Sequence, residues 1–163
     1  MEKVLLADIG LLARRVLLLL DSTRQGLGQV AHGKPLATLI ALRGDLGAGK
    51  TTFVQALAKE LGVHGIIQSP TYVLMKRHNI PHHKYFIHLI HIDAYRLEGA
   101  NEFAALRPEQ FLEDPHALVC VEWPERIEGA LPTPDITIQF SSDPPAGEAG
   151  NVGEKERYID IRT

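Results

Sequence analysis

The chain has 163 residues, which predicts one domain large enough to bury about two-thirds of its unfolded surface. Hydrophobic residues make up 45% and charged residues 23% of the sequence, as is ordinary for a globular protein in water. The formal net charge of -3 excludes a globally basic surface for nucleic acid, so contact with RNA needs a local patch or a partner protein.

Two further features indicate the compartment. The apolar run at 17–20 is too short to span a membrane, and the first residues lack a signal-peptide pattern with a small-residue cleavage site. The single cysteine, Cys120, excludes an internal disulfide and is interpreted as a small buried hydrophobe. We therefore expect a cytoplasmic protein without a membrane segment.

The N-terminal part is expected to be a helix, a strand and a second helix. The first helix reaches about Arg14, and 16–20 is interpreted as a strand, although a run of leucines has no period that separates strand from helix. Residues that cap helices stand at 21–23, so a short helix is predicted from there to about Ala31, ended by Gly33.

The next segment carries the motif G-x-x-x-x-G-K-[ST], at 44–51 (GDLGAGKT). Before it, the short apolar run at 36–43 is typical of a buried strand. After it, apolar residues recur at helical spacing until Gly62. Because strand, loop and helix stand in this order, a phosphate-binding loop is favoured over a glycine-rich turn that binds nothing.

The chemistry of this loop follows from its residues. Its glycines let backbone N–H groups crowd around a phosphate without Cβ clashes. The Lys50 ammonium is expected to reach the β- and γ-phosphates of a nucleotide, and the Thr51 hydroxyl is expected to bind Mg²⁺. The N-terminus of the following helix adds free N–H groups and the positive end of its dipole.

The rest of the chain alternates apolar runs with short helical pieces. A loop at 69–72 enters a strand at 73–75, and a turn at 79–84 contains Pro81. The elements that follow are a strand at 85–92, helical pieces at 101–106 and 108–112, a strand at 117–123, and half-buried strands at 136–140 and 159–161.

These elements predict an α/β fold of the P-loop NTPase type. Residues 1–163 are expected to form a single ATPase domain with a mainly parallel central sheet, helices on both faces and a C-terminal β-hairpin. The segment 141–156 is rich in Pro, Gly and Glu, which predicts a mobile loop between the last two strands.

Two carboxylates follow apolar strands on the edge where ligands bind in such sheets. Glu122 follows the run 118–121 and is the better candidate for an Mg²⁺ ligand, while Asp93 follows 90–92 and is a candidate for orienting water or the metal. The alternative for each is a carboxylate that caps a turn or faces solvent.

Three features leave alternatives open. The clustered histidines could form a zinc site, but surface or packing roles are the favoured interpretation. The four histidines are His82, His83, His88 and His91. The hairpin is locally basic, with Lys76, Arg77 and Lys84. These side chains either lie in a solvated loop or contact RNA or an acidic partner. Trp123 belongs either to the core or beside the nucleotide.

The nucleotide is expected to be ATP. P-loop proteins specific for guanine usually carry an N-K-x-D or T-K-x-D segment, and the sequence contains neither.

Four segments together resemble one family. They are GDLGAGKTTF at 44–53, SPTY at 69–72, HIDAYRLE at 91–98 and VEWPER at 121–126. Their order and content resemble the TsaE (also called YjeE) family, small bacterial ATPases of tRNA threonylcarbamoyladenosine synthesis. The resemblance covers 44 to about 131.

The resemblance implies a role for each matching residue. ATP phosphates would be bound by the loop and its flank, which comprise Asp45, Leu46, Gly47, Ala48, Gly49, Lys50, Thr51 and Thr52. Thr51 and Glu122 would be the Mg²⁺ ligands, and Asp93 would be needed for hydrolysis. Thr71 looks like a switch-type threonine near the γ-phosphate, and Thr23 resembles a threonine of the family's opening helix that lies near the nucleotide.

The resemblance also implies partners. The family's ATPase is weak alone and acts with TsaB and TsaD, which transfer a threonylcarbamoyl group to an adenosine of tRNA. Hydrolysis would reset that complex between turnovers, so the link to tRNA is indirect. This chain departs from the family's pattern in its N-terminal extension, its histidine-rich hairpin and its C-terminal loop.

Two other functions remain open from the sequence. A small-molecule P-loop kinase needs an acceptor pocket and usually an arginine-bearing lid, whereas the arginines between 71 and 122 are scattered. A nucleotide-gated binding module would bind ATP and rarely hydrolyse it.

Overall fold

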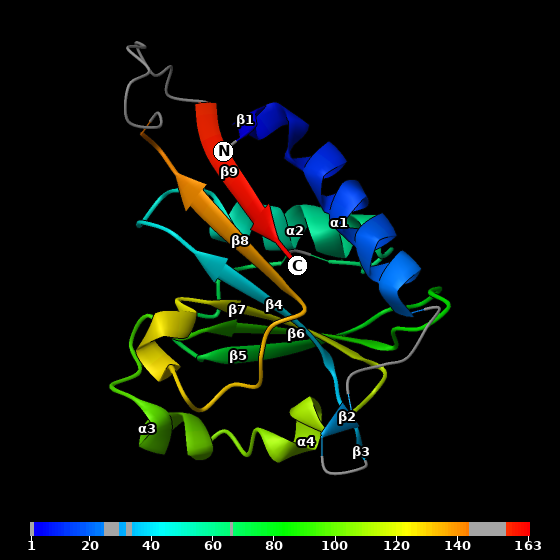
Figure 1. The fold of residues 1–163 in the computed structure, drawn as a ribbon, viewed down its shortest axis with the longest axis vertical. Coiled ribbons are helices and arrows are strands. Elements are labelled where there is room, and N and C mark those ends of the chain that lie inside the picture. The colour runs from blue at the N-terminus through cyan, green and yellow to red at the C-terminus, as the bar shows by residue number, and fades with distance from the viewer. Residues whose placement is uncertain (1, 25–29, 32–33, 66, 144–155) are drawn as a thin grey trace.

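The computed structural model describes residues 2–24, 30–31, 34–65, 67–143 and 156–163. They form a mixed α/β fold around one seven-stranded sheet of order β1-β9-β8-β4-β7-β6-β5, with helices on both sides (Figure 1). The strands are β1 (Glu2–Leu5), β4 (Thr38–Arg43), β5 (Met75–Asn79), β6 (His88–Asp93), β7 (Ala117–Glu122), β8 (Ile136–Ser141) and β9 (Glu156–Arg162). The helices are α1 (Ile9–Arg24), α2 (Lys50–Glu60), α3 (Ala100–Ala104) and α4 (Glu109–Leu112), with 3-10 turns η1 (Leu6–Asp8) and η2 (Pro124–Ile127). A separate small ribbon pairs β2 (Val30–Ala31) with β3 (Lys34–Pro35).

The centre of the sheet is parallel, as the sequence predicts. β8, β4, β7 and β6 run in the same direction, and the outer strands β5, β9 and β1 are antiparallel to their neighbours. β8 and β9 form the expected C-terminal antiparallel pair. Because β4, β6 and β7 are parallel and adjacent, their carboxyl ends meet at one edge of the sheet.

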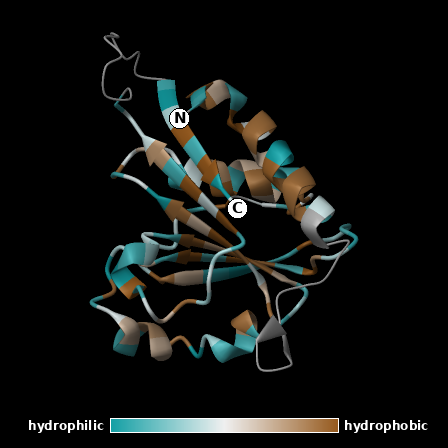
Figure 2. Ribbon diagram, viewed as in Figure 1, coloured by the Kyte–Doolittle hydropathy of each residue, from teal (hydrophilic) through white to brown (hydrophobic). Residues whose placement is uncertain are grey.

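Each face of the sheet has its own apolar core, because successive strand side chains point to opposite faces. Ile40 and Leu42 lie in the core under α1 and α2, and Leu39 lies in the smaller core that includes residues of α3 and α4. All six residues of β7 are buried, as its continuous apolar sequence indicates. Figure 2 shows hydrophobic residues concentrated on the central strands and the inner sides of the helices.

The sequence prediction for the N-terminal part is wrong in two places. The segment 16–20 is not a strand but lies inside α1, which continues to Arg24, and 30–31 forms β2 rather than the end of a helix. The buried residues of α1 recur every three or four positions, at Ile9, Leu12, Ala13, Val16, Leu17 and Leu20. That helical period continues through the exposed Arg14 and Arg15, at which the prediction had ended the helix.

Two leucines of α1 test whether the segment 16–20 is helical. Leu20 is 1% exposed and Leu18 is 64% exposed, so only Leu20 packs in the core. Leu20→Ala is expected to lower the free energy of unfolding by about 2–5 kcal/mol, and Leu18→Ala by less than about 0.5 kcal/mol. Urea unfolding of both variants measures this, and equal losses would contradict the helical placement.

The edge strand β5 begins later than predicted. The apolar 73–75 was interpreted as the strand, but β5 runs through the polar Met75–Asn79. A strand at the edge of a sheet tolerates polar side chains because one side has no neighbouring strand. Leu74, before the strand, has a φ of 64° and belongs to the preceding turn.

Three further predictions concern the elements between 85 and 112, the loop at 141–156, and a membrane-spanning helix. The strand expected at 85–92 is β6, which ends at Asp93, and the two short helical pieces are α3 and α4. Of the loop predicted at 141–156, Ser141 belongs to β8 and Glu156 to β9, and 144–155 lie outside the described residues. Among the described residues, no helix is both long and apolar enough to cross a lipid bilayer.

Candidate active site

The loop 44–51 joins the carboxyl end of β4 to the first turn of α2, as its motif predicts. Gly44 has a φ of 128°, and a Cβ there would lie 2.2 Å from the carbonyl oxygen of Phe140, so no side chain fits. Gly47 has a φ of 78° and nothing within 4 Å of its ideal Cβ, so the loop is open on this side. The first N–H groups of α2 have no partner within the helix, which suits an anion at this position.

Lys50 places a buried ammonium group against this loop. The residue is 4% exposed, and its Nζ donates to the carbonyl oxygens of Gly44 and Asp45, the latter at 2.7 Å. Nζ also lies 4.0 Å from the centre of the Trp123 ring. Burial lowers the pKa of Lys50, and the carboxylate of Glu122 opposes this shift.

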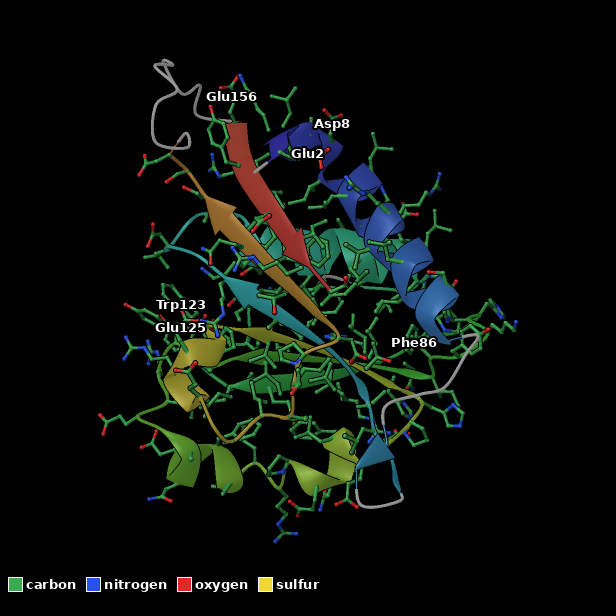
Figure 3. The ribbon with its side chains drawn as sticks, viewed as in Figure 1. Glu2, Asp8, Phe86, Trp123, Glu125 and Glu156 are labelled. Carbon is green, nitrogen blue, oxygen red and sulfur yellow. The ribbon has the colours of Figure 1, made fainter. Side chains whose placement is uncertain are left out.

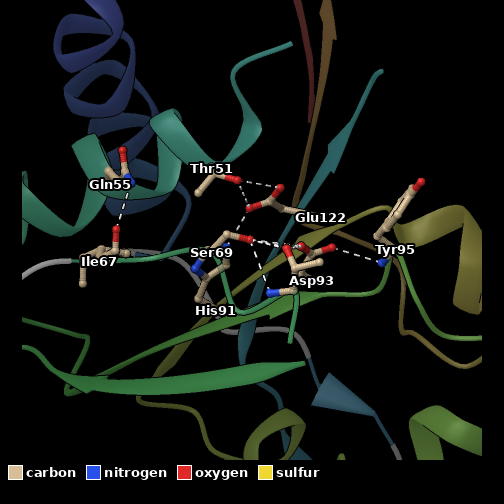
Figure 4. A network of polar contacts seen from close by, with 9 residues as sticks. Thr51, Gln55, Ile67, Ser69, His91, Asp93, Tyr95 and Glu122 are labelled. Carbon is tan, nitrogen blue, oxygen red and sulfur yellow. Dashed lines mark hydrogen bonds and ion pairs between the residues drawn. The ribbon is translucent and has the colours of Figure 1, made fainter. Parts of the chain in front are cut away.

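Thr51 and Glu122 are hydrogen bonded directly (Figure 4). Thr51 Oγ1 shares its hydrogen between Glu122 Oε1 at 2.8 Å and Oε2 at 3.0 Å. Glu122 is 3% exposed, and its Oε1 also contacts Nε2 of His91 at 2.8 Å. The two predicted metal ligands, Thr51 and Glu122, are therefore brought together from α2 and the end of β7.

Asp93 lies beside Glu122 because the two residues pair in the parallel register of β6 and β7. Its Oδ2 accepts hydrogen bonds from Thr71 Oγ1 and, at 3.1 Å, from Ser69 Oγ, while its Oδ1 accepts from the backbone N–H of Tyr95 at 3.0 Å. These hydrogen bonds fix the orientation of the Asp93 carboxylate. The segment 69–72 thus lies over Asp93, which brings the predicted Thr71 into the site.

Most of these residues line one cavity of about 320 Å³; Gly44 and His91 lie behind its lining. Its predicted members are Leu46, Gly47, Gly49, Lys50, Thr51, Thr52, Thr71, Asp93 and Glu122. Of the other residues predicted to bind nucleotide, Asp45 contacts Lys50 through its carbonyl, Ala48 is buried within the loop, and the Thr23 side chain lies outside the described residues.

Ser69, Tyr95 and Trp123 complete the lining. Ser69 and Tyr95 belong to the quoted motifs, but no role was predicted for them. Trp123 was predicted to lie either in the core or beside the nucleotide. In the structure its φ is 59°, it lines the cavity 5.2 Å from the Tyr95 ring, and it also packs against the smaller core. Figure 3 labels Trp123 next to Glu125.

The chemistry of the lining fits Mg²⁺ with a nucleotide phosphate. Mg²⁺ prefers hard oxygen ligands, and a hydroxyl and two carboxylates converge here from Thr51, Asp93 and Glu122. The glycine loop, the start of α2 and the Lys50 ammonium supply N–H groups and positive charge to the same cavity.

The clustered histidines do not form a zinc site within the described ranges. No group of three or more His, Cys, Asp or Glu side chains there could hold a metal ion. His83 stacks on Phe86 at 4.9 Å, and His91 contacts Glu122. Cys120 is fully buried as predicted, and burial raises the pKa of its thiol.

Trp123 gives a direct signal for ligand binding, since it is the chain's only tryptophan and lies over Lys50. Addition of Mg-ATP is expected to change its emission, because the phosphates draw the ammonium away from the ring. A fluorescence titration measures this change. Saturating Mg-ATP without any spectral change, while calorimetry reports binding, would show that the nucleotide lies away from Trp123.

Comparisons with known proteins agree on one family. The family model described as "Threonylcarbamoyl adenosine biosynthesis protein TsaE" matches residues 20–149. Proteins named "tRNA threonylcarbamoyladenosine biosynthesis protein TsaE" are similar to the chain. That of Synechocystis sp. is 41% identical over 111 residues, which is 66% of this chain and 68% of the relative. That of Haemophilus influenzae is 36% identical over 106 residues, which is 64% of this chain and 63% of the relative.

A solved structure supports the same assignment. The crystal structure of Bacillus subtilis YdiB is similar with a TM-score of 0.53 and 28% identity, over 77% of this chain and 67% of that one. The family match covers most of the chain and includes the loop, both strand-end carboxylates and the segment that holds Thr71. The chain belongs to the TsaE family of tRNA threonylcarbamoyladenosine biosynthesis proteins.

Proposed function

We propose that this chain is a single-domain ATPase of the P-loop NTPase fold that binds Mg-ATP and allows repeated tRNA threonylcarbamoyladenosine synthesis by TsaB and TsaD. The observation that carries the proposal is the direct contact of Thr51 with Glu122, beside the buried Lys50 and Asp93, in one cavity. This is the arrangement needed to hold a metal-bound triphosphate.

Binding begins with the phosphates on the loop. Lys50 exchanges its contacts with the Gly44 and Asp45 carbonyls for the β- and γ-phosphate oxygens. The N–H groups of the loop and of the first turn of α2, including Thr52, surround the same anion. Thr51 and Glu122 hold Mg²⁺, which when bound neutralises charge on the phosphoryl oxygens.

Hydrolysis then depends on Asp93. Its carboxylate, held by Ser69, Thr71 and the Tyr95 N–H, orients the attacking water toward the γ-phosphate. Thr71 couples this carboxylate to the segment 69–72, so the segment can respond to whether the γ-phosphate is present.

A kinase is disfavoured by the lining of the cavity. Transfer to a small acceptor needs cationic groups over the phosphates, usually arginines on a lid. No arginine is among the described residues that line the cavity, and Arg96 lies instead over the ring of Tyr72 at 4.5 Å.

The relatives' names support the place of the reaction in tRNA modification. The alignments cover 63–68% of these relatives, so the partner proteins TsaB and TsaD and the cytoplasmic location are part of the proposal. The chain acts on tRNA indirectly, through that complex.

Counting modification events tests the proposal. TsaB, TsaD, their threonylcarbamoyl donor and tRNA are incubated with and without this chain, and the modified nucleoside is counted per complex. Several rounds per complex are expected only with the chain and hydrolysable ATP. The same number of rounds without the chain would contradict the proposal.

A further inference from the structure

The buried His91 contacts Glu122 and has no part in the proposed phosphate binding or hydrolysis. It lies at the centre of β6 with 0% exposure and pairs with Cys120 in the register of β6 and β7. Its side chain therefore points to the same face as Glu122, two residues beyond Cys120. Its Nε2 lies 2.8 Å from Glu122 Oε1, and since a carboxylate only accepts, Nε2 carries the hydrogen.

The other ring nitrogen argues against a packing role. Nδ1 of His91 is buried, and among the described residues it has no hydrogen-bond partner. An unsatisfied buried acceptor costs free energy that an apolar side chain of similar size would avoid. Packing alone therefore does not account for a histidine at this position.

The two oxygens of Glu122 are held unequally. Oε1 accepts from both His91 and Thr51, at 2.8 Å each, whereas Oε2 accepts only the longer branch from Thr51, at 3.0 Å. Thr51 is itself a candidate metal ligand, so its hydroxyl would bind Mg²⁺ as well as donate to Glu122. Within the part of the chain that the structure describes, the hydrogen bond of the His91 side chain is to this carboxylate.

We propose that His91 is a positioning residue whose Nε2–H fixes Oε1 of Glu122 so that Oε2 faces Mg²⁺ in the cavity. This inference rests on the proposed binding of Mg-ATP. Donors behind a metal-binding carboxylate set its orientation, and their removal typically weakens metal binding by about 10- to 100-fold.

Two amide variants of His91 distinguish the hydrogen bond to Glu122 from the mere presence of a polar side chain. The side chain of His91→Gln is long enough to place an N–H near the Nε2 position, whereas that of His91→Asn is one carbon shorter and does not reach Glu122. His91→Asn is expected to raise the dissociation constant for Mg²⁺ by about tenfold or more, and His91→Gln is expected to stay within about threefold of the wild type. His88→Asn is the matched control, because His88 lies on the same strand and Glu122 bonds to His91 rather than to it.

The readout is metal affinity rather than turnover. Mg²⁺ is titrated into each ATP-saturated variant while Trp123 emission is followed, and ATP affinity is measured separately in EDTA. The inference requires weaker Mg²⁺ binding in His91→Asn with ATP affinity in EDTA unchanged. Wild-type Mg²⁺ affinity in His91→Asn, or equal losses in both amide variants, would overturn it. If the wild type itself bound ATP without any effect of Mg²⁺, the proposed function would fail as well.

A measurement on the unaltered protein covers the case in which both variants misfold. Nitrogen NMR of the histidine rings is expected to show His91 protonated at Nε2 and bare at Nδ1. A bare Nε2 would remove the donor and overturn the inference.

Discussion

Replacing Lys50 with alanine is expected to lower the affinity for ATP by about 10- to 100-fold, the value of one charge-assisted contact. The ammonium is buried and already aligned by the Gly44 and Asp45 carbonyls, so little ordering is needed when it moves to the phosphates. Calorimetric titration with Mg-ATP measures the loss.

The control for this prediction is Lys59→Ala, which removes an exposed lysine in the last turn of the same helix. It is expected to bind ATP as the wild type does. Thermal unfolding of Lys50→Ala is recorded in parallel, because the variant leaves two carbonyl groups without their donor. Wild-type affinity in a folded Lys50→Ala protein would contradict the assignment of the phosphate loop.

Replacing Asp93 with asparagine is expected to reduce hydrolysis by about 10²- to 10⁴-fold and leave ATP binding within a few-fold of the wild type. Asparagine keeps the volume of the side chain, and its single oxygen can accept from Ser69 or Thr71. It removes the charge that orients the attacking water. Single-turnover phosphate release measures hydrolysis, and Trp123 emission measures binding.

Asp160→Asn is a matched control, since Asp160 lies on β9 and pairs with Arg162 on the surface. It is expected to leave both measurements unchanged. Normal turnover by Asp93→Asn would show that the assigned role is wrong. If the affinity for ATP fell by the same factor as the rate of hydrolysis, Asp93 would instead contribute to binding of ATP in the ground state.

The part of the site closest to the sequence motifs could be predicted because its geometry is local. A strand, a glycine-rich turn and a helix N-terminus fix the positions of Lys50 and Thr51. Asp93 and Glu122 could be predicted because both end apolar strands, and parallel strands end at the same edge. Thr71 could be named only from the family resemblance, since its contact with Asp93 joins residues 22 apart.

The contribution of His91 could not be predicted from the sequence. Its contact with Glu122 spans 31 residues and depends on the register of β6 against β7. In the sequence it is one of four clustered histidines, and residue type alone does not separate it from the others. The signal that could have identified it is position: it lies two residues before a strand-end carboxylate, on the same face.

Errors in the fold arose where a short segment was considered alone. The leucines at 17–20 suit a strand or a helix, and the helical period is visible only together with the earlier residues of α1 that are buried in the same core. The polar sequence of β5 has no apolar alternation, because it is an edge strand whose backbone pairing with β6 supplies the order.

Phosphate release from Mg-ATP by the purified chain, alone and with TsaB and TsaD from the same source, decides between the functions considered for this site. We expect slow release by the chain alone and a marked rise only when both partners are present, and we expect Asp93→Asn to abolish that rise. Release that is indifferent to TsaB and TsaD, with phosphate passed to a small hydroxyl-bearing acceptor, would contradict the proposed function and assign the site to a kinase.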